Sequence, residues 1–188
     1  MDSVLRAFSI GFLLRSLFAG VSCLIAYKVT GDGVGSVGSI AAKNLFSEVL
    51  PIAVFSGVTI YSLHRSMVYP WIEHILNSDR GRTWRQKWPL ISRNTIELLS
   101  SQWIFNAEPG KESQALSSHY STWADYTHLQ YAFAICIAVG SAVRTLVHPA
   151  DYVVNPLLAT LILIFLTSAL ISDWRLHAIR EHVARGEA

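Results

Sequence analysis

Four long apolar runs alternate with polar segments along the chain and define its organisation. The runs cover residues 11–29, 45–61, 129–147 and 153–171. Each has about 17–20 residues, the length at which an α-helix crosses about 30 Å of hydrocarbon. A soluble globule of this size needs polar surface and could bury one such run but hardly four. The pattern therefore predicts an all-α integral membrane protein with four transmembrane helices.

The composition agrees with a membrane location. Charged residues make up 15% of the 188 residues, against about 25% in an ordinary soluble domain. The first run is too long for the apolar core of a signal peptide, and no small-residue cleavage site follows it closely, so we expect a retained first span. Cys23 and Cys136 fall within predicted spans and resemble small apolar side chains there. We expect no metal and no cofactor, and the net charge of +2 gives no indication of a nucleic-acid partner.

Lysine and arginine are distributed unevenly between the runs, which predicts an orientation. Only Lys28, Lys43 and Arg144 belong to one side. The other twelve are Arg6, Arg15, Arg65, Arg80, Arg82, Arg85, Lys87, Arg93, Lys111, Arg175, Arg180 and Arg185. The positive-inside rule then places both termini and the central segment in the cytoplasm. We expect a multi-pass protein of a bacterial inner membrane.

This orientation divides the chain into four parts. Residues 1–71 form a first transmembrane hairpin, 72–127 a tryptophan-rich helical cap in the cytoplasm, 128–172 a second hairpin, and 173–188 a cytoplasmic C-terminal helix. Pro70 is expected to break the helix that follows the second span. A helix that starts near 117–121 is expected to run without interruption into the third span.

The cap contains a basic and aromatic cluster that predicts contact with lipid or a partner. Trp84 and Trp88 are four residues apart, and Arg80, Arg82 and Arg85 lie beside them. This is the composition of a helix that lies in the headgroup layer. A surface that stacks bases and binds phosphates has a similar composition. The lipid interpretation is favoured because the chain already lies in a membrane.

Three charged residues within or near the predicted spans are candidates for a polar or pore-lining role. Arg15 lies about one turn inside the first span, where it either snorkels to the headgroups or faces a water-filled path. Glu48 and Arg144 lie at similar depth near the outer ends of the second and third spans. They either contact each other, within one protomer or between two, or reach headgroup water separately.

The third span carries a stripe of small residues. Ala134, Ala138 and Ala142 recur at four-residue spacing. Such a stripe lets helix backbones approach closely. We expect it to form a tight helix–helix contact, either within the protomer or between copies.

A small polar cluster is expected at the inner mouth of the third span. Asp125 and His128 are three residues apart on a predicted helix, and His119 precedes them. Two helical ligands are too few for a structural metal site. A hydrogen-bonded polar pair is therefore favoured over metal binding.

No nucleophile elbow, phosphate-binding loop or paired acids within one span can be identified, so we expect no enzymatic activity. The favoured function is a homo-oligomeric membrane assembly that acts as a channel, a pore-forming effector or a membrane-sensing subunit. The alternatives are a lipid-acting enzyme that uses the inner-mouth cluster and a scaffold without chemistry. In span count and cap size the layout resembles small four-span membrane subunits of bacterial anti-phage systems, such as that of the Kiwa system. That resemblance implies antiviral defence and a cytosolic partner protein that docks on the cap, besides lipid and further copies of the chain.

Overall fold

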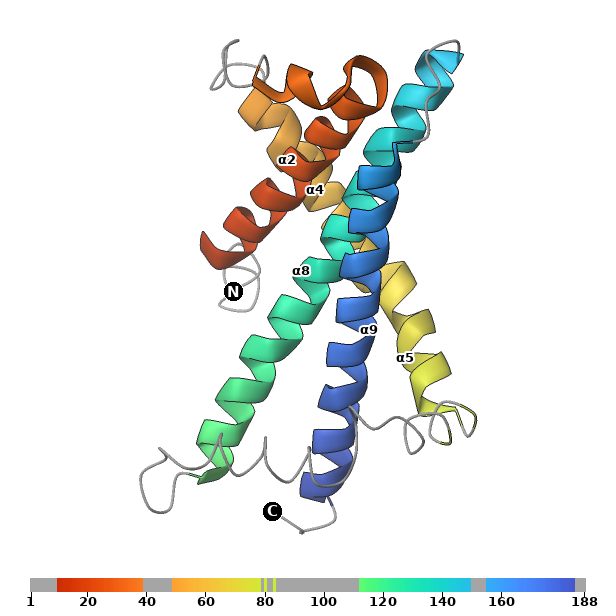
Figure 1. Cartoon of the computed structure of the whole chain (residues 1–188). Helices are drawn as coiled ribbons and strands as arrows, with labels where there is room; N and C mark the ends of the chain where they lie inside the picture. Colours follow the sequence, from red (N-terminus) through yellow and green to blue (C-terminus); the bar gives the residue numbers. More distant parts are fainter. Residues whose placement is uncertain are drawn as a thin grey trace. The chain divides into compact units, whose positions relative to one another are not determined.

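The computed structural model describes residues 10–38, 49–78, 80, 83, 112–149 and 155–184, and within them all regular structure is helical (Figure 1). The elements are α2 (Ile10–Asp32), the short 3-10 helix η1 (Val34–Ser36), α4 (Leu50–Leu63), the π-helical turn η3 (His64–Val68), α5 (Tyr69–Asn77), α8 (Glu112–Val147) and α9 (Pro156–Ala184). The expected all-α class is confirmed for the described residues.

Three helices are long and apolar enough to cross a membrane: Phe12–Asp32, Gln114–Val147 and Pro156–Arg180. They contain the third predicted span and most of the first and fourth. The second predicted span overlaps α4, which has 14 residues, and its first residues, 45–48, lie outside the described ranges. Three candidate spans agree with a multi-pass membrane protein. Four spans and their orientation remain predictions.

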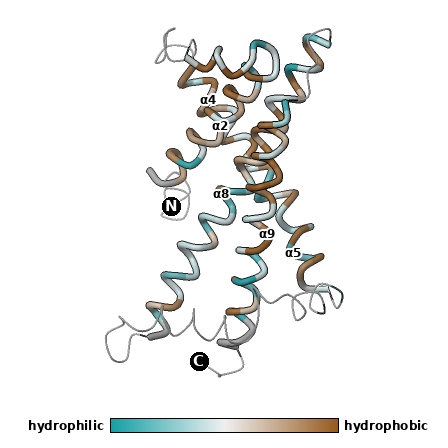
Figure 2. Tube along the Cα trace, viewed as in Figure 1, coloured by the Kyte–Doolittle hydropathy of each residue, from teal (hydrophilic) through white to brown (hydrophobic). Residues whose placement is uncertain are grey.

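Helices α8 and α9 are both longer than a membrane is thick. The predicted uninterrupted helix is confirmed, because α8 runs over 36 residues, about 54 Å at 1.5 Å per residue. Figure 2 shows hydrophilic residues in its first half and hydrophobic residues in its second. α9 has 29 residues, about 44 Å, and continues past Asp173 to Ala184. Each helix therefore extends beyond about 30 Å of hydrocarbon.

The expected break at Pro70 is wrong. His64–Val68 form a π-helical turn, and α5 follows directly with Pro70 in its first turn. Proline lacks a backbone N–H and its ring crowds the carbonyl four residues earlier. Pro70 stands in the first turn of α5, where its missing N–H and fixed φ are tolerated, so the chain stays helical through it.

Contacts divide the chain into two compact units: Met1–Met67 with Leu129–Leu166, and Val68–His128 with Thr167–Ala188. In the first unit, α2 and α4 approach closely at two glycines. A Cβ on Gly20 would collide with the backbone carbonyl of Ala53, and a Cβ on Gly57 with that of Ser16. Only residues without a side chain permit this crossing, as in other close contacts between membrane helices.

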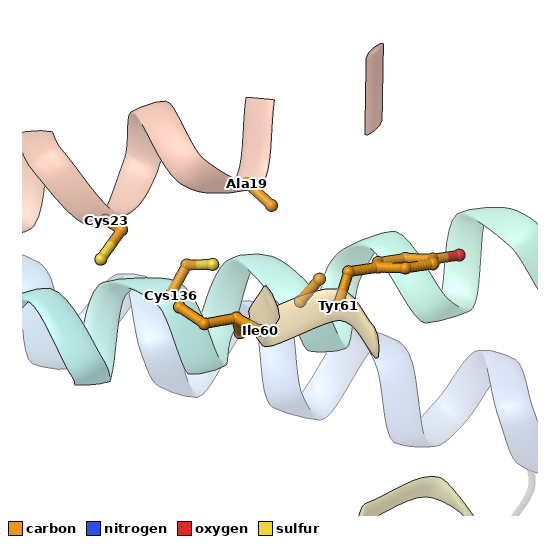
Figure 3. Packing of buried hydrophobic residues seen from close by; sticks show 6 residues of the cluster. Ala19, Cys23, Ile60, Tyr61 and Cys136 are labelled. Atoms are coloured by element: carbon orange, nitrogen blue, oxygen red, sulfur yellow. The ribbon is translucent and has the colours of Figure 1, made fainter. Parts of the chain in front are cut away.

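α2 also contacts α8 closely. A Cβ on Gly140 would collide with the carbonyl of Cys23, and Ala132 and Cys136, at four-residue spacing before it, are both 0% exposed. A core shared by α2, α4 and α8 contains Ala19, Cys23, Ile60, Tyr61, Ala132 and Cys136 (Figure 3). A second cluster joins α2, α8 and α9 through Ala26, Val29, Ile137 and Leu158. Both α2 and α8 therefore contribute to each of the two clusters of the first unit.

The second unit has its own apolar core, formed by the N-terminal part of α8 and the C-terminal part of α9. Its buried members are Leu116, Leu176 and Ile179. Tyr120 and Trp123 of α8 and Trp174 of α9 pack around them. These two polar helix ends thus bury apolar side chains against each other and form a compact structure.

Candidate functional sites

A buried polar cluster forms where α5, α8 and α9 meet in the second unit. Asp173 is 1% exposed, and His128 and His177 are 4% and 5% exposed. Helical spacing places Asp173 and His177 on one face of α9, because they are four residues apart. Tyr69 is the first residue of α5, and its ring packs edge-on against the His128 ring with centroids 4.3 Å apart. Three separate helices therefore supply this cluster.

The Asp173 carboxylate is the centre of the cluster. The Tyr69 hydroxyl donates a hydrogen bond to Asp173 Oδ1 at 3.3 Å, and His177 Nε2 lies 3.9 Å from the same oxygen. A buried carboxylate needs such donors because moving its charge out of water is expensive. Burial and the nearby carboxylates of Asp173 and Glu73 raise the pKa of Tyr69, so its hydroxyl keeps the proton that it donates. The cluster can hold a carboxylate in apolar surroundings and fix α5 to α9.

The predicted inner-mouth residues are only partly involved in this cluster. His128 belongs to it, whereas His119 is exposed and Asp125 is half-buried. Tyr69, Asp173 and His177 were missed by sequence analysis. One signal was present, since an acid directly after the fourth apolar run is followed by a histidine four residues later. Within the described ranges, no three His, Cys, Asp or Glu side chains gather as a metal site would require.

An ion-pair network in the first unit holds the predicted candidate Arg144. Arg144 Nη2 lies 3.2 Å from Asp32 Oδ1, and Lys28 Nζ lies 2.9 Å from Asp32 Oδ2. The guanidinium also lies over the Tyr27 ring, 5.3 Å from its centroid. A Cβ on Gly31 would collide with the guanidinium, so the glycine keeps this approach open. Arg144 therefore pairs α8 with the end of α2.

Asp32 was not predicted as the partner of Arg144. It lies in the glycine-rich sequence 31–39 that follows the first predicted span, but α2 continues through Asp32, its last residue. Gly33 follows the helix with a φ of 78°, which favours glycine. The predicted partner Glu48 lies outside the described residues. The third candidate, Arg15, is half-buried on α2.

The small residues of α8 face two different directions. Ala134 is 1% exposed, but Ala138 and Ala142 of the predicted stripe are exposed. The close contact within the chain uses Ala132, Cys136 and Gly140 instead. Because 100° separates consecutive residues of a helix, a stripe displaced by two positions is rotated by about 200°. The end of the predicted stripe thus remains on the surface of the chain.

Of the predicted lipid- or partner-binding residues in the cap, Arg80 is described and exposed. Arg82, Trp84, Arg85 and Trp88 lie outside the described residues. Comparison of the chain with family models, with curated proteins and with solved structures gives no match.

Proposed function

We propose that the protein is a homo-oligomeric membrane subunit that acts as a channel, pore-forming effector or membrane sensor. The observation that carries the proposal is the second small-residue face of α8. Ala138 and Ala142 are exposed there, beside Val139 (36% exposed) and Val143 (43%). In contact with lipid, small side chains gain little packing energy, whereas in contact with a second helix they permit close approach of the two backbones. The occupant of this face is a second copy of the chain.

The continuity of α8 suggests how such an assembly transmits a signal. Leu116 and Trp123, which belong to the apolar core of the second unit, lie on the same unbroken helix as Ala138 and Ala142. A ligand or partner that shifts the cap end of this helix would alter its packing against the neighbouring copy. Interfaces of packed helices change between discrete arrangements rather than continuously, which suits gating or sensing. The layout resemblance suggests a cytosolic partner and a role in anti-phage defence.

A lipid-acting enzyme that uses His119, Asp125 and His128 has less support. His128 is 4% exposed and its ring packs against Tyr69. A general base must reach the proton that it removes, directly or through one water molecule. The burial of His128 and its contact with an aromatic ring therefore favour a structural role over a catalytic one.

The experiment compares the mass of the particle in nanodiscs for the wild type and for two variants in which an exposed alanine is replaced by leucine. Ala138→Leu should dissociate the oligomer, because the added side chain separates the two α8 helices. Ala159→Leu is the matched control, since Ala159 is also exposed but lies on α9. A monomeric wild type refutes the assembly, and an unchanged Ala138→Leu oligomer refutes the α8 interface.

Ion flux from liposomes then separates a channel from a scaffold. A channel should show flux that changes its charge selectivity in Arg15→Gln. Flux that is absent in the wild type under all tested stimuli, with the oligomer intact, would favour a sensor or scaffold.

A further inference from the structure

One face of α5 is apolar and exposed although the opposite face is buried. Trp71 is 71% exposed, Ile75 59% and Val68 42%, whereas Leu76 is 2% exposed. On a helical wheel of 100° per residue, Trp71 and Ile75 lie about 40° apart, Val68 immediately precedes the helix, and the exposed His74 borders this face about 60° from Trp71. Tyr69 and Leu76 lie about 140–160° from Trp71. We call the exposed residues Val68, Trp71 and Ile75 the α5 stripe.

We propose that the α5 stripe is a lipid-binding surface that lies in the interfacial layer of the membrane. The inference rests on the membrane location contained in the proposed function but not on the oligomer. Tryptophan with aliphatic residues on one face of a short helix is the pattern of interfacial helices. The indole ring of Trp71 suits the headgroup boundary because its body is apolar and its N–H is polar.

The chain around α5 supports lipid rather than a protein as the occupant. α5 follows the apolar helix α4 through the π turn without a loop, so only this turn separates α5 from the helix that contains the second predicted span. Arg65 and Arg80 precede and follow it, and both are exposed. Basic residues beside an apolar stripe are attracted to anionic headgroups. The acid of α5, Glu73, is half-buried and lies about 200° from Trp71, away from the stripe.

The buried face of α5 explains why this orientation is fixed. The Tyr69 hydroxyl donates to Asp173 of α9 at 3.3 Å, and the Tyr69 ring packs on His128 of α8. These two contacts prevent α5 from rotating the stripe inward. The second unit therefore exposes Trp71 and Ile75 on a surface whose orientation is fixed.

The test is the accessibility of nitroxide labels to oxygen, which is concentrated in lipid, and to a water-soluble nickel complex. Labels are attached at Ile75→Cys and Trp71→Cys in nanodiscs that contain phosphatidylglycerol. Ser118→Cys, exposed on the polar part of α8, is the water reference. Leu163→Cys, 64% exposed on α9, is the lipid reference. The unmodified protein is the labelling blank, since its cysteines Cys23 and Cys136 are 8% and 0% exposed.

Labels on the stripe should show an oxygen-to-nickel accessibility ratio several-fold above that of the Ser118→Cys label and close to that of the Leu163→Cys label. A ratio equal to the water reference would overturn the lipid-binding surface. Low accessibility to both reagents would also overturn it, because a protein partner or second copy would then cover the stripe. If the Leu163→Cys label itself reports water, the membrane location in the proposed function fails as well.

Discussion

The crossing of α2 and α4 predicts that Gly57→Ala destabilises the protein even though alanine favours helices. A Cβ at this position collides with the backbone carbonyl of Ser16, which cannot rotate away as a side chain could. The two helices must therefore separate. The same reasoning applies to Gly20 against Ala53, on the other side of the crossing.

The magnitude follows from two opposing terms. Overpacking of a well-packed contact costs about 1–3 kcal/mol, and a gap of up to about 1 Å forfeits a quarter to a half of the dispersion energy of the atoms that it separates. Alanine recovers up to about 1 kcal/mol of helix propensity. We expect a net loss of about 1–2 kcal/mol in the free energy of unfolding.

The assay is reversible unfolding in mixed micelles, followed by helical circular dichroism as the fraction of denaturing detergent rises. Gly35→Ala is the matched control, because a Cβ there meets nothing within 4 Å. Its stability should change by no more than about 0.5 kcal/mol. Gly20→Ala combined with Gly57→Ala should cost less than the sum of the two, since the first substitution already separates the helices. Equal stabilities of Gly57→Ala and Gly35→Ala would refute the close crossing.

Three further predictions concern polar contacts. Asp32→Asn should lower the thermal unfolding temperature slightly, and by less in high salt, because its contact with Arg144 is partly exposed (38% for the Asp32 side chain); a loss that salt leaves unchanged would contradict an electrostatic origin. Tyr69→Phe should lower stability by about 1–3 kcal/mol, since it removes the hydroxyl that donates to buried Asp173, and an unchanged unfolding transition would show that this bond contributes nothing. Burial lowers the pKa of His64 to about 4, so between that pKa and the ordinary value of 6.5 the unfolded chain binds more protons than the folded one. The free energy of unfolding should therefore be full above pH 6.5 and fall as the pH drops towards 4. A His64→Gln variant with the same pH dependence in unfolding experiments would rule out His64 as the cause.

The long helices could be predicted from the sequence because their cause is local. A run of apolar residues of the right length specifies a spanning helix whatever its neighbours are, and the described parts of α2, α8 and α9 agree with that expectation. The continuation of α8 from the polar segment into the third span was also predictable, because no proline or cap interrupts the sequence there.

The rotation of each helix about its own axis could not be predicted in the same way. α8 carries two small-residue stripes, and only packing against α2 selects Ala132, Cys136 and Gly140 for the inner contact. The pairing of Arg144 with Asp32 depends on α2 extending through Gly31, a residue that locally favours a turn. The Tyr69–Asp173 bond joins residues 104 positions apart, which no local pattern reveals.

The π turn before Pro70 acts as a one-residue insertion in a helical sequence. In α4 the buried positions are Ala53, Gly57, Ile60 and Tyr61. Continued α-helical spacing of three and four residues would place His64 and then Val68 on the same face. After the turn the inward positions are instead Tyr69 and Leu76, one residue later. Deletion of a single residue within His64–Val68 would restore the α-helical rhythm and turn every later side chain of α5 by about 100°. The length of this five-residue turn therefore sets the helical register of α5 along the chain, although the turn contains no residue of α5.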